Sequence, residues 1–122
     1  MSEAVLHITS SEAWLAAMES GSYAPESLTA EGFIHCSRPS QILDVANAFY
    51  RGQRELILLV IDPDLLTGEL RWEPPAEAHP GGHAPEGESF PHLYGALNLE
   101  AVTRTVRFEP NTDGQFRTLP EL

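Results

Sequence analysis

The hydrophobic and polar positions along the chain change their spacing several times, which predicts both strands and helices in its first half. Residues 4–9 and 31–37 alternate between the two kinds of side chain, as strands with one apolar face do. Hydrophobic residues at three- and four-residue spacing predict one helix over roughly 9–21 and a second over roughly 37–52. The first half therefore reads as strand, helix, strand, helix.

Hydroxyl residues and glycines mark the ends of both predicted helices. Thr9, or a serine directly after it, is placed to cap the first helix with Glu12, and this helix should end near Gly21. Ser37 is the N-cap expected for the second helix, with Pro39 in its first turn. The side chains expected to face inward are Trp14, Leu15 and Met18 in the first helix and Ile42, Val45, Ala46 and Phe49 in the second.

Strands dominate the rest of the chain, whereas residues 22–30 read as turns. A continuous apolar run within 55–62 predicts a central strand covered on both faces, followed by one helical turn at Leu65 and Leu66. The segment 74–89 holds four prolines and three glycines, so we expect an irregular loop that is either a binding lid or disordered. Further strands are expected at 69–73, 90–95 and 102–108.

This order of elements favours a single α+β domain, with two early helices followed mainly by antiparallel strands. The expected core covers residues 4–108, and a polar tail follows over 109–122. A chain of 122 residues is long enough to bury about two thirds of its surface without a disulfide or a metal. The lone cysteine, Cys36, alternates to the apolar face of its strand and is interpreted as a core residue.

The charge balance narrows the range of partners. Eighteen acidic residues against seven arginines, with no lysine, give a formal net charge of −11. Such a surface repels phosphate backbones and anionic lipids, so neither general nucleic-acid binding nor membrane binding is expected. A small anionic ligand in a local pocket remains compatible with this charge. Because no long apolar run and no signal-peptide pattern is present, we expect a cytoplasmic protein.

Three predicted strands carry a histidine followed two positions later by a hydroxyl residue. The pairs are His7 with Thr9, His35 with Ser37, and His92 with Tyr94. A spacing of two places both members of a pair on one strand face, so the three pairs predict the walls of a shared pocket. Each pair also has a purely structural interpretation, as hydrogen-bonding histidines, helix caps and a core tyrosine.

Two further features bear on what such a pocket would bind. The pairs ending in Thr9 and Ser37 precede predicted helix starts, whose free N–H groups attract phosphate or carboxylate, and Arg38 could add a charged fork there. Neutral histidines are also good zinc ligands, so convergence of His7, His35 and His92 is an alternative. Nothing in their spacing requires a metal.

A resemblance to a known family rests on four segments, and it spans most of residues 4–107. The segments are His7-Ile8-Thr9, the run from Glu31 to Ser37, Arg71-Trp72-Glu73, and the run from Phe90 to Gly95. On these the chain closely resembles an uncharacterised family of bacterial and plant proteins catalogued as domain of unknown function 952. That family is distantly similar to the ADP-ribosyltransferase fold, in which split antiparallel sheets clamp NAD in a cleft.

The resemblance implies an ADP-ribosyltransferase-like role for several residues. His7 and Thr9 match the first-strand element that holds the ribose and nicotinamide of NAD. Tyr94 would stack on the nicotinamide. Glu73 and Glu100 are both candidates for the late glutamate that orients the nucleophile, and His92 could occupy its place.

The leading hypothesis is thus a protein that binds NAD or an ADP-ribose-like nucleotide and that, as an enzyme, transfers ADP-ribose or hydrolyses the glycosidic bond without a metal. His35 and His92 would supply acid–base assistance, with Tyr94 and Glu73 beside them. His7, Thr9, Ser37 and Arg38 would bind the nucleotide. Two alternatives stay open, a zinc hydrolase built on the histidines and a non-catalytic module whose 74–89 loop recognises a protein partner.

Overall fold

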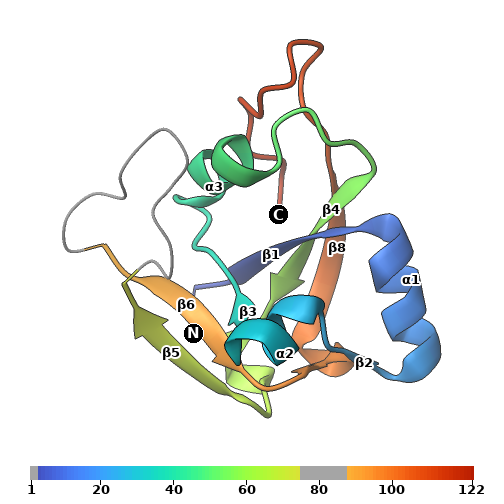
Figure 1. The fold of residues 1–122 in the computed structure, drawn as a ribbon, viewed down its shortest axis with the longest axis vertical. Coiled ribbons are helices and arrows are strands. Elements are labelled where there is room, and N and C mark those ends of the chain that lie inside the picture. Colours follow the sequence, from blue (N-terminus) through green and yellow to red (C-terminus); the bar gives the residue numbers. More distant parts are fainter. Residues whose placement is uncertain (1–2, 75–87) are drawn as a thin grey trace.

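A computed structural model gives the fold and describes residues 3–74 and 88–122. Figure 1 shows the elements along the chain. In order they are β1 (Val5–Ser10), α1 (Ser11–Ser20), β2 (Ser22–Tyr23), α2 (Glu26–Glu31), β3 (Ile34–His35), α3 (Ile42–Phe49), β4 (Leu56–Ile61), the 3₁₀ turn Pro63–Leu65, β5 (Glu69–Glu73), β6 (Phe90–Tyr94), β7 (Leu97–Asn98), the 3₁₀ turn Leu99–Ala101 and β8 (Val102–Phe108).

The strands of the described residues form three antiparallel sheets. The first has the order β1-β4-β8, the second pairs β2 with β7, and the third has the order β3-β6-β5. The apolar run of β4 is the central strand of the first sheet, as its sequence predicts. A small α+β domain with antiparallel sheets is therefore confirmed.

One bridge joins the first and third sheets. Leu6 of β1 and Ser37, two residues after β3, exchange two backbone hydrogen bonds, each with an N···O distance of 2.8 Å. We call this pair the Leu6–Ser37 bridge. It brings the ends of β1 and β3 side by side, so the histidine-bearing segments of both strands meet although 28 residues separate them in the chain.

Helix α1 begins and ends as the sequence predicts, but it presents a different face to the core. Ser10 is its N-cap and accepts the Ala13 N–H at 3.0 Å, and Gly21 ends it with a φ of 96°. Trp14 is buried, as expected. Leu15 and Met18, however, are 56% and 49% exposed, so the prediction that they point inward is wrong.

The orientation of α1 is explained by the two residues through which it packs on the core, one large and one small. Trp14 and Ala17, three positions apart, are the buried side chains of the helix. The indole of Trp14 lies against the Tyr23 ring, with centroids 6.3 Å apart. One large aromatic anchor and one small neighbour thus fix the helix, and the hydrophobic pattern offers no means to rank Trp14 and Ala17 above Leu15 and Met18.

Three other local predictions are wrong. Residues 22–30 hold β2 and the six-residue helix α2, which starts after Pro25 and ends at Gly32 with a φ of 90°; six residues are too few to show a helical period. The second predicted helix begins at Ile42 rather than after Ser37, because the Ser37 backbone is bonded to Leu6. In that helix Phe49 is 43% exposed rather than part of the core.

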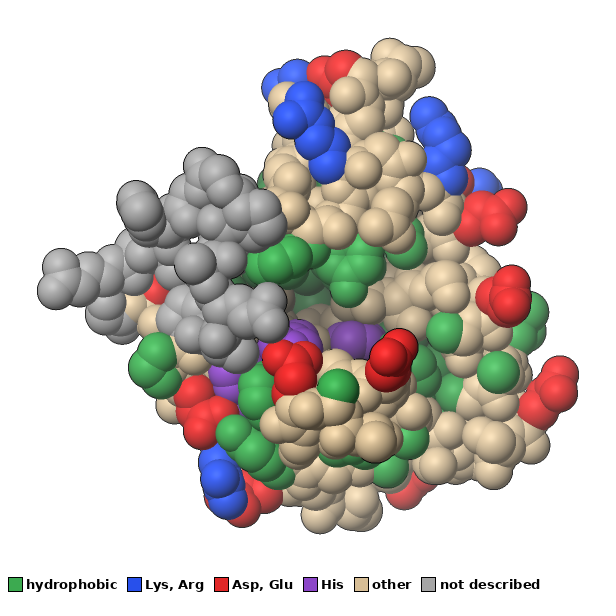
Figure 2. All heavy atoms as spheres, viewed as in Figure 1, with side chains coloured by type: hydrophobic (Ala, Val, Ile, Leu, Met, Phe, Trp, Pro, Cys, Tyr) green, Lys and Arg blue, Asp and Glu red, His purple; other side chains and the backbone are tan. Residues whose placement is uncertain are grey.

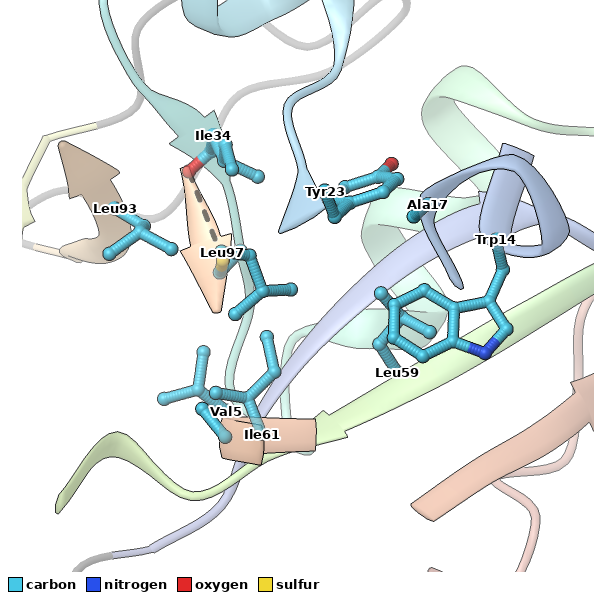
Figure 3. Packing of buried hydrophobic residues seen from close by; sticks show 11 residues of the cluster. Val5, Trp14, Ala17, Tyr23, Ile34, Leu59, Ile61, Leu93 and Leu97 are labelled. Carbon is cyan, nitrogen blue, oxygen red and sulfur yellow. Dashed lines mark hydrogen bonds between the residues drawn. The ribbon is translucent and has the colours of Figure 1, made fainter. Parts of the chain in front are cut away.

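Two hydrophobic clusters fill the interior, one on each face of the first sheet. Leu6 and Ile8 of β1 pack in the cluster that includes Ile42 and Phe108. Val5 of β1 packs on the other side, in the cluster shown in Figure 3 with Trp14, Tyr23, Ile34, Cys36 and Leu93. The alternation predicted for β1, and the core position of Cys36, are thus confirmed.

The polar tail over 109–122 contains no helix or strand but packs on the domain. Phe116 is 2% exposed and stacks on Phe108, with ring centroids 4.7 Å apart. The Asn47 amide accepts the Phe116 N–H at 2.7 Å and donates to its carbonyl at 2.9 Å. The tail is therefore part of the folded unit.

Two expectations concern regions at the limits of the structure. Of the predicted loop 74–89, residues 75–87 lie outside the described residues, so the choice between a lid and disorder is untested. Among the helices that the structure describes, none has the length and apolar character needed to cross a membrane.

Candidate functional site

A cleft of about 1020 Å³ opens between helices α1, α2 and α3, above the ends of strands β1, β3 and β6. Figure 2 shows it as a hollow with histidine side chains at its bottom. The residues of the predicted pocket that line it are His7, Thr9, His35, Ser37 and His92. Convergence of the three strand segments is therefore observed, since all three histidines border one cleft.

The floor of the cleft holds a hydrogen-bonded chain of three side chains. The Tyr23 hydroxyl lies 2.8 Å from Nε2 of His7 and 2.9 Å from Oγ1 of Thr9. Nδ1 of His7 lies 2.6 Å from the backbone oxygen of His35. His7 is thus tied both to the third sheet and to strand β2, and its two ring nitrogens are engaged with protein atoms.

The protonation state of His7 follows from these partners. The His35 carbonyl can only accept, so Nδ1 of His7 carries a hydrogen. Burial lowers the pKa of His7 from 6.5 to about 4 and is the largest effect. The hydrogen bond to the His35 carbonyl acts in the opposite direction and raises this pKa, and the charge of His35 lowers it by a smaller amount. His7 is therefore neutral near pH 7, and its Nε2 is the ring nitrogen without a hydrogen, 2.8 Å from the Tyr23 hydroxyl.

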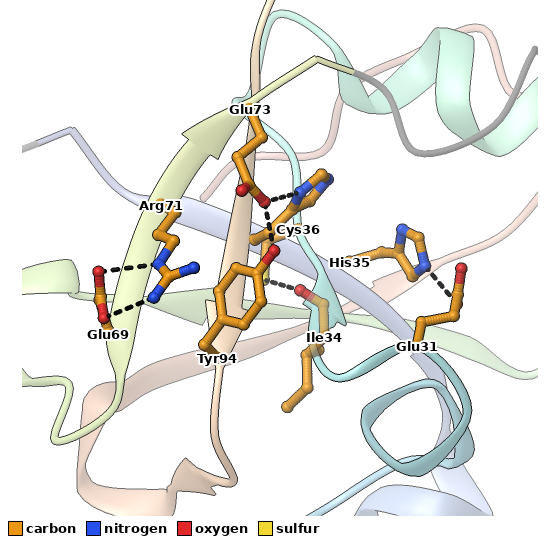
Figure 4. A network of polar contacts seen from close by, with 9 residues as sticks. Glu31, Ile34, His35, Cys36, Glu69, Arg71, Glu73 and Tyr94 are labelled. Carbon is orange, nitrogen blue, oxygen red and sulfur yellow. Dashed lines mark hydrogen bonds and ion pairs between the residues drawn. The ribbon is translucent and has the colours of Figure 1, made fainter.

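A second polar cluster stands behind the cleft wall, on β5 and β6 (Figure 4). Oε1 of Glu73 accepts the Tyr94 hydroxyl at 2.7 Å and lies 2.8 Å from Nδ1 of His92. These two hydrogen bonds, that of Tyr94 first, lower the pKa of Glu73, and the same carboxylate raises the pKa of Tyr94. Glu73 thus joins His92 and Tyr94, so one carboxylate connects three of the four residues predicted to be catalytic.

The fourth, His35, lies directly across the strand pair from His92. The two are register partners of β3 and β6, and their rings are 5.7 Å apart. The Phe33 ring stacks on His92 at 4.3 Å and contacts His35 at 4.8 Å. His35 pairs through Nε2 with Glu31 of α2 at 2.7 Å and is the exposed member of the two. Each histidine therefore has its own carboxylate.

Ser37 and Arg38 do not form the anion site expected at a helix start. Ser37 lines the cleft, but no helix begins there, because α3 starts at Ile42. The Arg38 guanidinium lies 4.5 Å from the centre of the Trp72 ring, on the edge strand β5, and Arg38 does not line the cleft. The predicted helix start at Ser37 is wrong because residues 38–41 form turns rather than helix. Ligand binding by Ser37 and Arg38 stays a prediction.

The other expected anion site, at the start of α1, is partly occupied by the protein itself. The Ser11 N–H donates to the Glu55 carbonyl at 3.0 Å, and the Ala13 N–H donates to Ser10. Thr9 bonds Tyr23 rather than the helix, so the capping serine and the cleft threonine are different residues.

Cys36 also borders the cleft but is 4% exposed, and burial raises the pKa of its thiol to about 12. Such a thiol is not a nucleophile at neutral pH, in keeping with its predicted role in the core.

Residues 3–74 and 88–122 contain no arrangement of side chains suited to bind zinc. No three side chains of histidine, cysteine, aspartate or glutamate come together there in an arrangement that could hold a metal ion. His7 illustrates why, since both of its ring nitrogens bond protein atoms. A metal at His7 would have to replace the Tyr23 hydroxyl or the His35 carbonyl.

Sequence reasoning misses three residues of the site. On sequence alone Tyr23 belongs to a turn, Phe33 is an apolar strand residue without a role, and Glu31 starts a strand. Only Glu31 has a usable signal: it precedes His35 by four residues, and the left-handed Gly32 between them turns the helix end back toward the strand. Tyr23 and Phe33 reach the site through tertiary packing alone.

Fold and site together define a small antiparallel α+β domain with a cleft lined by histidines. The chain belongs to the family described as protein of unknown function DUF952, whose model matches residues 8–105. It is similar to the crystal structure of protein CC0527 from Caulobacter crescentus, with 31% identity, a TM-score of 0.78 and 93% of each chain covered.

Two further structures of CC0527 from the same organism give the same result. The crystal structure of a double mutant of CC0527 has 30% identity and a TM-score of 0.78, again with 93% of each chain covered. The solution NMR structure has 33% identity and a TM-score of 0.71, covering 93% of this chain and 91% of that one. No curated protein matches the chain.

Proposed function

We propose that the cleft binds a nucleoside-type ligand, that is a base joined to ribose, and that its histidines act on the glycosidic bond. NAD and ADP-ribose-like nucleotides are the members of this class that the family resemblance suggests. The observation that carries the proposal is the facing pair His35 and His92, each held by a carboxylate, on one wall of the cleft.

The size and composition of the cleft fit such a ligand. Its volume of about 1020 Å³ lies at the upper end of the range, about 300–1,000 Å³, that is usual for small-molecule sites. Thr9, Ser37 and Tyr23 offer hydroxyl groups at the floor that match ribose hydroxyls in hydrogen-bonding character. Phe49 and Phe90 offer apolar and aromatic surface for a base.

His92 is suited to act as a general base. A carboxylate can only accept, so Nδ1 of His92 carries the hydrogen that it shares with Glu73. In the neutral ring this leaves the lone pair on Nε2, and the Glu73 hydrogen bond and the Phe33 ring hold the imidazole in one orientation. Glu73 and Tyr94 are then positioning residues, since they act through His92.

The reaction that this arrangement supports is transfer of the ribosyl group. The bond between the ribose C1′ and the base nitrogen breaks, and its electron pair leaves with the base. An oxygen of water or of an acceptor forms the new bond to C1′, and its proton passes to Nε2 of His92. With water the outcome is glycosidic hydrolysis, and with another acceptor it is ADP-ribosyl transfer when the ligand is NAD.

The test is a titration with NAD, ADP-ribose and nicotinamide riboside, followed by calorimetry and by backbone amide shifts. We expect saturable shifts at Thr9, His35, Ser37 and His92. His35→Ala removes an exposed side chain and should weaken binding by about tenfold, the equivalent of about 1.4 kcal/mol. Arg104→Ala, which also changes an exposed residue but lies outside the cleft, should leave binding unchanged.

A second measurement separates binding from chemistry. Release of free nicotinamide from the riboside should fall with His92→Gln far more than the binding constant does, because the base acts only in the reaction. If none of the three ligands shifts the cleft resonances, the proposal is wrong.

A further inference from the structure

The lining of the cleft has an unusual charge composition. Of the residues that the structure describes, no arginine lines the cleft, although the chain contains seven, and it contains no lysine. Two glutamates do line it, Glu26 and Glu31, both on α2. Residues 75–87 contain neither arginine nor lysine in their sequence. A ligand in the cleft therefore meets acidic side chains and no permanent cation.

Four of the arginines have partners elsewhere. Arg71 forms an ion pair with Glu69 and lies over the Tyr94 ring, and Arg38 lies over Trp72. Arg107 and Arg117 pair with Glu109 and Asp113. Arg38 follows the cleft residue Ser37 in the chain and lies over Trp72 of β5 without lining the cleft. Arg51 and Arg54, which adjoin the cleft residues Tyr50 and Gln53 in the chain, are exposed and do not line the cleft either.

Other sources of positive charge are also weak at the floor. His7 is neutral near pH 7, since burial lowers its pKa to about 4. Helix α1 begins at the cleft, but its Ser11 and Ala13 N–H groups are bonded to Glu55 and Ser10. A phosphate dianion entering the cleft would lose hydration without gaining the charged donors that usually replace it.

Part of the cleft lining, on α1 and at the end of α3, is apolar. Ala13 and Ala16 contribute to it from α1, and Val45, Phe49 and Tyr50 from the end of α3. Phe49 is 43% exposed, and it borders the cleft rather than the core. Apolar surface that borders a cleft is available to the apolar part of a ligand.

We infer that the cleft selects uncharged or cationic ligands with an apolar portion, and that among nucleoside-type ligands it prefers the unphosphorylated ones. This inference rests on the proposed function and narrows it. The ribose would lie at the Thr9 and Ser37 hydroxyls and the base along the alanine and phenylalanine surface. Phosphate groups on the ligand would lie in the acidic field of Glu26 and Glu31.

The test compares nucleosides with their 5′-monophosphates, which differ only in phosphate. Nicotinamide riboside and its monophosphate form one pair, and adenosine and its monophosphate form a second. NAD and ADP-ribose, which also carry a further nucleoside or ribose, complete the two series. At about 20 mM salt, where charges are poorly screened, we expect each nucleoside to bind at least about fivefold more tightly than its monophosphate. At about 0.5 M salt the difference should shrink to about twofold or less.

A pair of matched variants assigns the effect to the cleft. Glu26→Gln removes one negative charge from the lining, and Glu19→Gln removes the same charge from an exposed position of α1 outside it. Glu26→Gln should tighten binding of the monophosphates by about twofold to threefold, because it removes the Coulombic repulsion between the Glu26 carboxylate and the phosphate. Binding of the nucleosides, which carry no phosphate, should be nearly unchanged. Glu19→Gln should change neither.

The outcomes separate the two proposals. Tighter binding of the monophosphates than of their nucleosides overturns the charge inference and leaves the proposed function standing. Equal effects of Glu26→Gln and Glu19→Gln also overturn it, since they would assign the preference to net charge rather than to the cleft. Absence of binding by every member of both series overturns the proposed function itself.

Discussion

His35 and His92 face each other across the β3–β6 pair with ring centroids 5.7 Å apart, and each is paired with a different glutamate. The two pairs differ in environment. His92 is 3% exposed, and the carboxylate of its partner Glu73 also accepts the Tyr94 hydroxyl. His35 and its partner Glu31, in contrast, are exposed at the rim of the cleft. The same two residue types thus form one buried pair with a fixed orientation, His92 with Glu73, and one exposed pair, His35 with Glu31.

The stability of the folded protein at acid pH should depend on Glu73, the partner of His92. Its pKa lies below the ordinary 4.5 in the folded protein, so the charged carboxylate stabilises the fold above this value. That contribution is lost as the pH falls below 4.5 and toward the folded pKa. We expect Glu73→Gln to unfold more easily at pH 7 and to lose less stability than the parent between neutral and acid pH.

The measurement for Glu73 is urea unfolding over a pH series. Glu19→Gln is the control, because Glu19 is exposed on α1 and far from this cluster in sequence. An unchanged acid dependence in Glu73→Gln would contradict the role of the carboxylate in the Tyr94 and His92 hydrogen bonds.

The floor of the cleft should be sensitive to loss of one oxygen atom. Tyr23→Phe deletes the hydroxyl that bonds both His7 and Thr9, and leaves the buried Nε2 of His7 without that partner. We expect the free energy of unfolding to fall by about 1–3 kcal/mol. Thr9→Val removes only the outer hydrogen bond of the chain and should cost less. Denaturant unfolding of both variants decides the order, and a larger loss in Thr9→Val would contradict the arrangement.

His7 should give a distinct pH dependence. Its pKa is about 4 when folded and 6.5 as the ordinary value, so between these limits the unfolded chain binds a proton that the folded protein does not. Stability therefore rises with pH across this window, and His7 alone accounts for about 3 kcal/mol of that rise. Titration of the His7 ring by NMR should give a midpoint near 4, and a midpoint near 6.5 would contradict its burial as a neutral ring.

The orientation of α1 can be tested with substitutions on its two faces. Trp14→Ala empties a buried aromatic site and should cost about 3–5 kcal/mol. Leu15→Ser and Met18→Ser change exposed side chains and should stay within about 0.5 kcal/mol of the parent. Thermal unfolding of the three variants is sufficient. A large loss in either serine variant would favour the inward packing that the hydrophobic pattern suggests.

The sequence predicts those parts of the fold in which local pattern and tertiary packing agree. The run Leu56–Ile61 could only be a covered strand, and the alternation of Val5 to Thr9 assigns each side chain of β1 to the correct face. Convergence of the three histidine segments is also predicted, because each histidine shares a strand face with a hydroxyl residue two positions later. These features need no knowledge of distant contacts.

The remainder depends on contacts that leave no local trace. Ser37 reads as a helix cap, but its backbone pairs with Leu6, which lies 31 positions earlier, and the helix starts later as a result. Tyr23 reaches His7 from the short strand β2, which pairs with β7 far along the chain. Arg38 lies against Trp72 because β5 occupies the edge of the third sheet. These three errors each concern a residue placed by a contact with another sheet or strand pair.

The Leu6–Ser37 bridge joins the two sheets that carry the floor of the cleft. His7 and Thr9 belong to the first sheet, and His35 and His92 belong to the third, so the two sides of the floor are carried by separate sheets. Two backbone hydrogen bonds at Leu6 and Ser37 and the bond from His7 to the His35 carbonyl connect them at this point. The distance between His7 and the histidines of the third sheet therefore depends on this contact between two sheets, and not on the geometry of any one strand.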